Sequence, residues 1–383
     1  MIINATCYVC GTDELVAVEK FEQLPRVTSD CKPFPAGGRL ATCHRCGAIQ
    51  KPADATWRKE IGSIYDNYDI YYQSMGVEQS VFNFGRGTPR LRSQVLLEHV
   101  HEVHPLGTMG VILDVGCGKG TFLQAFAKFR PKWRSFGHEL SRKNQDILAR
   151  IPTFERLYTT SFAGLPGGFD VVALIHALEH FEKPVEGLRQ LKPKLTSDGI
   201  IVVQVPNASA TPFDLLVADH ASHFTQRDLV NLSKRSGLAP IVVADYWITK
   251  ELSLVAVPGS ATAVSTDPST AITAHLATTR RIEWLQRLLE DASKTAENSS
   301  KFGIFGTSIA AMWLFGILEN SVDFFVDEDP GRIGNLHGRP VLPTDCIPND
   351  ATVYIALIPE VADAVAARIG RNRSLKLPPP VSW

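Results

Sequence analysis

The sequence predicts an α/β protein whose centre is a doubly wound sheet, preceded by a small cysteine-bearing region and followed by a smaller βαβ unit. Three observations predict this fold class. Apolar segments alternate with amphipathic segments through the middle of the chain, two Cys-x2-Cys pairs lie near the N-terminus, and a second strand–turn–helix pattern begins near residue 301. Because strands that alternate with helices usually pair in parallel, we expect a parallel central sheet.

A chain of 383 residues is long enough for two or three domains, each with its own core. The sequence predicts a cysteine-bearing domain over residues 1–72, a central α/β domain over 73–258, and a linker helix with a smaller α/β domain over 259–383. The expected strands of the central domain lie at 110–116, 135–140, 169–176 and 199–206, with a helix at 183–195.

The last third of the chain repeats the strand–helix alternation on a smaller scale. Its apolar residues recur at helical spacing over 280–294, after a linker rich in threonine and alanine at 259–271. A strand, a glycine turn and a helix follow at 301–318, and further strands are expected at 322–328 and 351–359. The proline-rich tail that ends the chain is predicted to be loose.

Composition argues against several classes of partner. Lys and Arg number 39 against 40 Asp and Glu, so no basic excess favours nucleic acid. The most apolar run, Ser308 to Leu318, is 11 residues long and too short to cross a bilayer. The N-terminus lacks the basic start and apolar run of a signal peptide. We therefore expect a cytoplasmic protein with reduced or metal-bound cysteines and no membrane partner. The sequence leaves the oligomeric state open.

Four cysteines form the two pairs near the N-terminus. They are Cys7, Cys10, Cys43 and Cys46. Each pair precedes a glycine, which lets the backbone turn so that its amides approach the sulfurs. Four thiolates satisfy a tetrahedral zinc ion, and such a site supplies folding energy to a region poor in apolar residues. The simpler alternative is four reduced cysteines in a small core, but we predict structural zinc.

A glycine-rich turn follows the first strand of the central domain, after Asp114. Glycines stand at 116, 118 and 120, so the third glycine comes one residue too early for a dinucleotide fingerprint. The turn also lacks the Gly-Lys-Ser/Thr ending of a phosphate-binding P-loop. The stretch closely resembles the first motif of class I S-adenosylmethionine-dependent methyltransferases.

That resemblance implies a cofactor site and its residues. In the family, the glycine turn passes beside the amino-acid end of S-adenosylmethionine, an acid at the end of the next strand binds the ribose, and two further segments flank the adenine and the sulfonium. The matching positions in this sequence are Asp114, Gly116, Cys117 and Gly118 at the turn, Glu139 at the ribose, Ser161 and Phe162 at the adenine, and His176 in the turn after the fourth strand.

The whole chain is similar to the sugar C-methyltransferases, which join a four-cysteine zinc domain, a methyltransferase core and a C-terminal Rossmann-like domain. In that family a Tyr, a Glu and a His lie close together, and a further His lies in the turn after strand four. The matching positions here are Val217, Asp219, His220 and His180. Tyr71, in a cluster of tyrosines before the core, is a further candidate near the acceptor.

The resemblance implies methylation of a nucleotide-linked keto-sugar at carbon, with a neutral histidine as base. Val217 lacks the hydroxyl of the family tyrosine, Asp219 is shorter than the family glutamate, and a His-Gly-Gly turn of the family is absent. Three readings therefore stay open: a C-methyltransferase, an O- or N-methyltransferase of another small metabolite or glycan, and a cofactor-binding protein without turnover. A Rossmann-like crevice around Gly303, Gly306 and Asp327 is a candidate site for the nucleotide.

Overall fold

A computed structural model describes residues 1–68, 80–81, 90–264, 266–370 and 374–381. Its centre is a seven-stranded α/β sheet, as the sequence predicts. In spatial order the strands are β11 (Phe154–Tyr158), β10 (Arg134–His138), β9 (Val111–Val115), β12 (Phe169–Ile175), β13 (Leu195–Pro206), β16 (Glu251–Pro258) and β15 (Leu238–Ala244). All neighbours pair in parallel except at β16, which runs antiparallel to both β13 and β15. This reversed strand is a difference from the all-parallel sheet that the sequence predicts.

Helices around the central sheet begin and end where local chemistry favours it. They are α1 (Ala55–Asp66), α2 (Arg92–Val103), α3 (Thr121–Phe129), α4 (Gln145–Leu148), α5 (Pro184–Leu191) and α6 (Gln226–Ser236). Helix α6 starts with a capping box between Thr225 and Asp228 and ends at Gly237, whose φ of 77° closes the last turn. Apolar side chains of α3, such as Leu123 and Phe126, are buried against the sheet.

The N-terminal region does not build its sheet alone. Four short strands, β1 (Ile2–Asn4), β2 (Glu14–Ala17), β5 (Ala41–Cys43) and β6 (Ile49–Gln50), are completed by β14 (Ser222–His223) from the central part of the chain. The pairing of β6 with β14 is antiparallel and sets Gln50 opposite Ser222 and Ile49 opposite His223. Two further hairpins join β3 (Arg26–Val27) with β4 (Pro33–Phe34) and β7 (Ser80–Val81) with β8 (Arg90–Leu91).

The C-terminal unit is a second, smaller α/β sheet. Its strands in spatial order are β19 (Gly334–Leu336), β20 (Arg339–Leu342), β18 (Phe324–Val326), β17 (Phe302–Phe305), β21 (Thr352–Tyr354) and β22 (Ser374–Lys376). The chain leaves the first strand, β17, toward β18 on one side and later returns to β21 on the other. This reversal of strand order creates a crevice at the carboxyl ends of β17 and β21, where doubly wound sheets bind ligands. The helices of the unit are α8 (Ile309–Leu318) and α9 (Pro359–Ile369).

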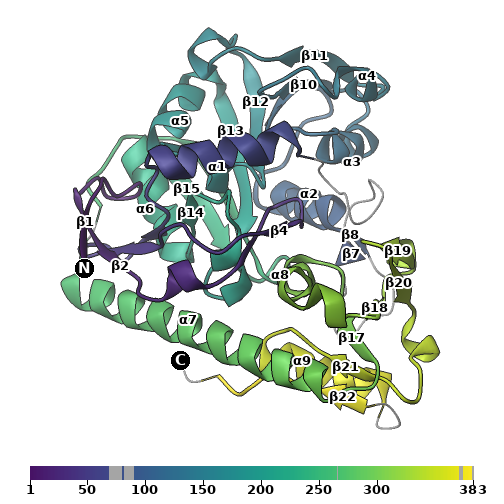
Figure 1. The fold of residues 1–383 in the computed structure, drawn as a ribbon. Helices are drawn as coiled ribbons and strands as arrows, with labels where there is room; N and C mark the ends of the chain where they lie inside the picture. The colour runs from purple at the N-terminus through teal and green to yellow at the C-terminus, as the bar shows by residue number, and fades with distance from the viewer. Residues whose placement is uncertain (69–79, 82–89, 265, 371–373, 382–383) are drawn as a thin grey trace.

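One long helix connects the parts of the molecule. Helix α7 (Pro268–Glu297) runs past the N-terminal sheet toward the C-terminal sheet (Figure 1). It begins inside the segment predicted as a linker, because Asp267 caps it and Pro268 occupies its first turn. The rings of Phe213, Trp284 and Trp313 meet edge to face in a core shared by all three parts of the chain.

The proline-rich tail, predicted to be loose, is anchored to that core: the indole nitrogen of Trp284 donates to the carbonyl oxygen of Pro379 at 2.8 Å. None of the helices in the described part of the chain has the length and apolarity that a membrane span requires.

Candidate functional site

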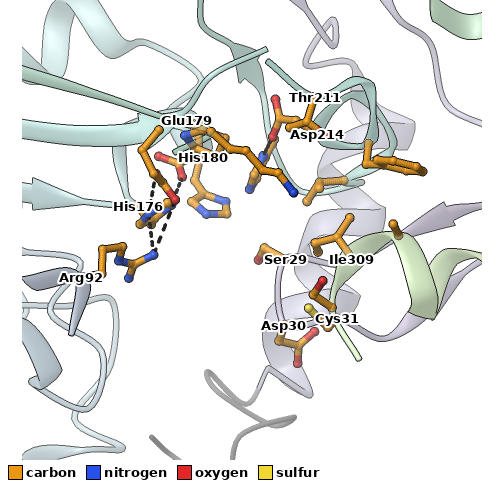
Figure 2. A pocket seen from close by; sticks show the side chains of 18 of the residues that line it. Ser29, Asp30, Cys31, Arg92, His176, Glu179, His180, Thr211, Asp214 and Ile309 are labelled. Carbon is orange, nitrogen blue, oxygen red and sulfur yellow. Dashed lines mark hydrogen bonds and ion pairs between the residues drawn. The ribbon is translucent and has the colours of Figure 1, made fainter. Parts of the chain in front are cut away.

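A cavity of about 330 Å³ lies where the three parts of the chain meet. The carboxyl-end side of the central sheet contributes His180 and His220, and the N-terminal region contributes Ser29. The C-terminal unit contributes Ser308 and Arg332. Figure 2 shows side chains from these elements around one space, with Glu179 and His180 on one side and Ser29, Cys31 and Ile309 on the other.

The predicted glycine turn lies directly after β9. Gly116 has a φ of 74°, and a Cβ added there would lie 2.8 Å from the Cβ of Ala177, in the turn after β12. Only glycine fits both the conformation and the close approach. The Gly118 amide donates to Oε1 of Glu139 at 2.7 Å, so the predicted ribose acid lies over the turn. The structure thus brings these predicted cofactor residues together.

Asp114, the last acid before the turn, is buried without a full set of partners. Its Oδ1 accepts no hydrogen bond from the residues that the structure describes. Burial, with a further contribution from the nearby Glu139 carboxylate, raises its pKa well above the ordinary range of an aspartate. A buried carboxylate oxygen without a donor suits a ligand that brings one, such as an ammonium group.

Cys117 lies in the turn, but its side chain points away from the ligand side. A Cβ added at Gly137 of β10 would lie 2.6 Å from the Cys117 sulfur, so the thiol packs into the core between strands. Its amide donates to the carbonyl oxygen of His138 at 3.3 Å. The residue therefore has a packing role, and only its backbone takes part in the turn.

The predicted adenine segment follows β11. Phe162 lies with its ring 4.9 Å from that of His138 and 5.7 Å from that of Phe181, measured between centroids. Ser161 is exposed directly before it, at the start of a short 3-10 turn. Through its contact with His138, Phe162 lies at the end of β10, directly before Glu139.

His176 is held by charged neighbours in the turn after β12. Its Nε2 lies 3.0 Å from a carboxylate oxygen of Glu251, and its Nδ1 lies 3.3 Å from Oε1 of Glu179. Burial alone would lower the pKa of this imidazole, but the Glu251 and Glu179 carboxylates raise it to about 9. His176 thus belongs to a cluster with these two carboxylates and with Arg92, whose Nη1 lies 2.8 Å from Nε2 of the ring (Figure 2).

His180 and His220, the two predicted acceptor-side histidines, pack against each other. Their ring centroids are 4.9 Å apart and their planes are nearly perpendicular, at 86°. His180 donates through Nδ1 to the carbonyl oxygen of Asp219 at 3.0 Å. Burial, together with the nearby His220, lowers the pKa of His180, so this ring is neutral near pH 7.

Asp214 is a functional candidate that the sequence did not reveal. Its Oδ1 lies 2.8 Å from Nδ1 of His220 and its Oδ2 lies 2.7 Å from Nδ1 of His223. Burial opposes ionisation of this carboxyl group, but the two imidazoles hold its pKa well below the ordinary aspartate value. Burial also acts on His220, yet Asp214 raises the pKa of that ring above its usual value. The only sequence feature that could have indicated this pair is the spacing of Asp214 and His220, six residues apart.

Asp219 is fully buried and does not face the cavity. Its Oδ1 accepts from the Ser29 amide at 2.8 Å, and its Oδ2 lies 2.5 Å from the Ser29 hydroxyl. This predicted residue therefore ties the N-terminal region to the loop that carries His220.

Tyr71 lies outside the described residues. Two other members of its tyrosine cluster are near the site: the Tyr65 hydroxyl lies 3.2 Å from Nδ1 of His180, and Tyr68 lines the cavity.

The four predicted metal cysteines come together. The sulfurs of Cys7 and Cys46 are 3.6 Å apart, those of Cys10 and Cys43 are 3.4 Å apart, and all four lie within 4.8 Å of one another. Backbone amides of Cys10 and Cys46 approach the sulfurs of Cys7 and Cys43 at 3.4 Å. Four sulfurs at these separations, with amides directed at them, fit the ligand set of a closed tetrahedral zinc site.

Comparison with known proteins matches part of the chain to a family. Residues 90–243 match the family model described as a methyltransferase domain. No curated protein sequence matches the chain.

The similar solved structures are distant. The mitomycin 7-O-methyltransferase MmcR is 19% identical over 44% of this chain and 54% of that chain, with a TM-score of 0.38. CalO1, a methyltransferase in calicheamicin biosynthesis, is 19% identical over 44% of this chain and 53% of that chain, with a TM-score of 0.35. A methyltransferase from Clostridium acetobutylicum ATCC 824 is 13% identical over 53% of this chain and 99% of that chain, with a TM-score of 0.38.

The chain spans about half the length of MmcR and of CalO1, and no substrate follows from such similarities. The family match covers β9, the glycine turn and Glu139, the elements that the sequence assigns to the cofactor. Residues 90–243 therefore match a methyltransferase domain, and this matched part contains the predicted S-adenosylmethionine site.

Proposed function

We propose that the protein transfers a methyl group to a carbon beside the keto group of a nucleotide-linked sugar, with His220 as the base. One observation supports this proposal above the others: a single cavity is lined by the central sheet, by the N-terminal region and by the crevice of the C-terminal unit. A bipartite acceptor, with a sugar at one end and a nucleotide at the other, suits a site with walls of such different origin.

S-adenosylmethionine would be held at the glycine turn. In this proposal Asp114 binds the ammonium group, Glu139 binds the ribose hydroxyls, and Ser161 and Phe162 flank the adenine. The cofactor supplies a methyl group on a sulfonium, which makes that carbon an electrophile. The unpaired Oδ1 of Asp114 supports the fit, because a buried carboxylate oxygen gains a donor when the ammonium group binds.

His220 is suited to removing the proton from the sugar carbon. Its Nδ1 faces the Asp214 carboxylate, so the proton of the neutral ring resides on Nδ1 and Nε2 remains a proton acceptor. The raised pKa of His220 makes it a stronger base than a free imidazole. His180 packs against it and orients the ring, and Tyr68 lines the same cavity.

The nucleotide would occupy the crevice of the C-terminal unit. Ser308 and Leu357 follow β17 and β21 and line the cavity, and Arg332 lines it from beside them. The Arg332 guanidinium donates to the Thr307 hydroxyl at 3.0 Å and lies 3.7 Å from the Asp327 carboxylate. A guanidinium beside a strand-end crevice is suited to a phosphate of the nucleotide.

A structural zinc ion at the four cysteines would supply folding energy to the N-terminal region. Metal analysis of the denatured protein is expected to release about one zinc ion per chain. Chelation should then lower the unfolding temperature, and a metal-free protein of unchanged stability would contradict the zinc site.

A second candidate reaction, O-methylation, is favoured by one specific observation. Val217 and Asp219 occupy the positions of the family Tyr and Glu, and the Asp219 carboxylate faces Ser29 rather than the cavity. A sugar hydroxyl as acceptor needs neither the family tyrosine hydroxyl nor the family carboxylate, and His220 would still act as its base.

Proton exchange separates the two reactions. Incubation of nucleotide-linked keto-deoxysugars in D₂O without the methyl donor should introduce deuterium at the carbon beside the keto group. With a labelled methyl donor, mass spectrometry should then place the methyl on that carbon.

His220→Asn should abolish both exchange and transfer while S-adenosylmethionine still binds by calorimetry. Transfer to oxygen without carbon exchange would overturn C-methylation, and full activity of His220→Asn would remove it as the base. Silence across a panel of nucleotide-sugars and related metabolites would favour a binding protein without turnover.

A further inference from the structure

We infer that Lys51, from the N-terminal region, positions the proposed base. Buried hydrogen bonds link Lys51 to His223, His223 to Asp214, and Asp214 to His220. Lys51 fixes the direction of these bonds, which keeps Nε2 of His220 free to accept a proton. Lys51, His223 and Asp214 are in this view positioning residues. The inference deepens the proposed function, because it concerns the residue assigned there as base.

Lys51 reaches the site because two parts of the chain share a sheet. It follows β6 directly, and β6 pairs with β14, which carries His223. The Lys51 amide donates to the carbonyl oxygen of Ala221 at 2.9 Å, which extends this pairing by one residue. The side chain is fully buried.

The ammonium group of Lys51 has three donors and meets three acceptors. Its Nζ lies 2.7 Å from the carbonyl oxygen of Val217, 3.3 Å from that of His220 and 2.6 Å from Nε2 of His223. A charged lysine can only donate, so Nε2 of His223 must be an acceptor. The tautomer of His223 is thereby fixed with its proton on Nδ1.

The same argument gives the direction of the hydrogen bonds from His223 through the Asp214 carboxylate to His220. Nδ1–H of His223 donates to Oδ2 of Asp214 at 2.7 Å, which leaves Oδ1 for His220. His220 donates from Nδ1 to Oδ1 at 2.8 Å, so its second nitrogen carries a lone pair. Each ring and each carboxylate oxygen in this chain has one direction of hydrogen bonding that satisfies every partner.

The charges around the chain are consistent with this arrangement. The titratable groups around His220 are Asp214, His223, Lys51, His180, Glu179 and Asp219. Burial, with the nearby Lys51 charge, lowers the pKa of His223 to about 4, so this ring stays neutral. Burial lowers the pKa of Lys51 to about 7 while Asp214 counteracts that effect, so the fully donated arrangement belongs to the acidic and neutral range.

Nitrogen NMR of the histidine rings tests the inference without an acceptor. The zinc-loaded full-length protein is labelled at its imidazole nitrogens, and spectra are recorded from pH 5 to 9. In the wild type, His220 and His223 should both carry the proton on Nδ1. Protonated Nε2 of neutral His220 would overturn the inference.

Two variants test the direction of the chain. Lys51→Met removes the donor and the charge beside His223, so the pKa of His223 should rise, and the pKa of His220 should also rise because both rings lose a nearby cation. Asp214→Asn should instead lower the pKa of His220, because that ring loses its carboxylate partner. Lys192→Met is the matched control, since Lys192 donates to the carbonyl oxygen of Gly259 away from these rings.

Calorimetry with S-adenosylmethionine verifies that each variant is folded. An unchanged tautomer and pKa of His220 in folded Lys51→Met would refute the role of Lys51 while leaving His220 as a candidate base. Conversely, turnover by His220→Asn would refute His220 as the base, whereas the hydrogen-bond directions inferred for the wild type would stand.

Discussion

The two strand–glycine–helix turns of this protein use their carboxylates in opposite ways. After β9, Asp114 is buried with an oxygen that no described residue satisfies, and the Glu139 carboxylate accepts from the backbone amides of Gly118 and Leu140. After β17, Asp327 accepts from the Thr307 hydroxyl at 2.9 Å and from the Asp329 amide at 3.0 Å. The first turn keeps acceptors for a ligand that brings donors, whereas the second turn satisfies its acid internally.

The largest expected effect is on cofactor affinity at the first turn. Glu139→Ala removes the acid proposed to bind two ribose hydroxyls, and hydrogen bonds to a charged group contribute about 1.5–3 kcal/mol each. We therefore expect S-adenosylmethionine affinity to fall roughly 100-fold by calorimetry, which corresponds to about 3 kcal/mol.

Two variants serve as controls for this loss. Asp327→Ala changes the acid of the second turn, and Glu155→Ala changes a surface acid of the neighbouring strand β11. Both should bind the cofactor as the wild type does. Equal losses at Glu139 and Asp327 would break the contrast between the two turns.

A smaller effect is expected on stability, with opposite signs at the two turns. The folded-state pKa of Asp114 is raised, so its contribution is favourable at low pH and is lost as pH rises through that pKa. Asp114→Asn should therefore raise the free energy of unfolding at pH 7, and the gain should shrink as pH is lowered. Asp327→Asn should lower it by about 1–3 kcal/mol, because Thr307 and Asp329 lose a charged acceptor.

Denaturant titrations at several pH values measure both variants. If Asp114→Asn instead destabilises the protein at pH 7, the Asp114 side chain is not an unpartnered group that is kept for the ligand.

Local patterns allowed the sequence to predict the cofactor end of the site. The residues from Asp114 to Gly120 form one strand and one turn, so their spacing alone fixes their geometry. Glu139 lies at the end of β10, next to β9, as alternating strands require. The acceptor end depends instead on contacts between distant segments, and the sequence assigned His180 and His220 to it through a family resemblance.

The unforeseen residues share this dependence on distant contacts. Lys51 and His223 are 172 residues apart and meet only because β14 completes the N-terminal sheet. Glu179, in the turn after β12, was likewise not predicted; its Oε1 lies 3.3 Å from Nδ1 of His176. The reversed strand β16 and the early start of α7 also escaped prediction, because alternation of apolar segments does not give strand direction and an alanine-rich linker is also a good helix former.

The central claim is that the glycine turn places the methyl donor against the cavity that His220 lines. A crystal structure with S-adenosylhomocysteine tests it most directly. We predict that the ribose hydroxyls bind Glu139, that the amino group reaches Asp114, and that the sulfur faces the cavity between His180 and His220. Binding of the compound elsewhere, or with its sulfur directed away from this cavity, would contradict the account.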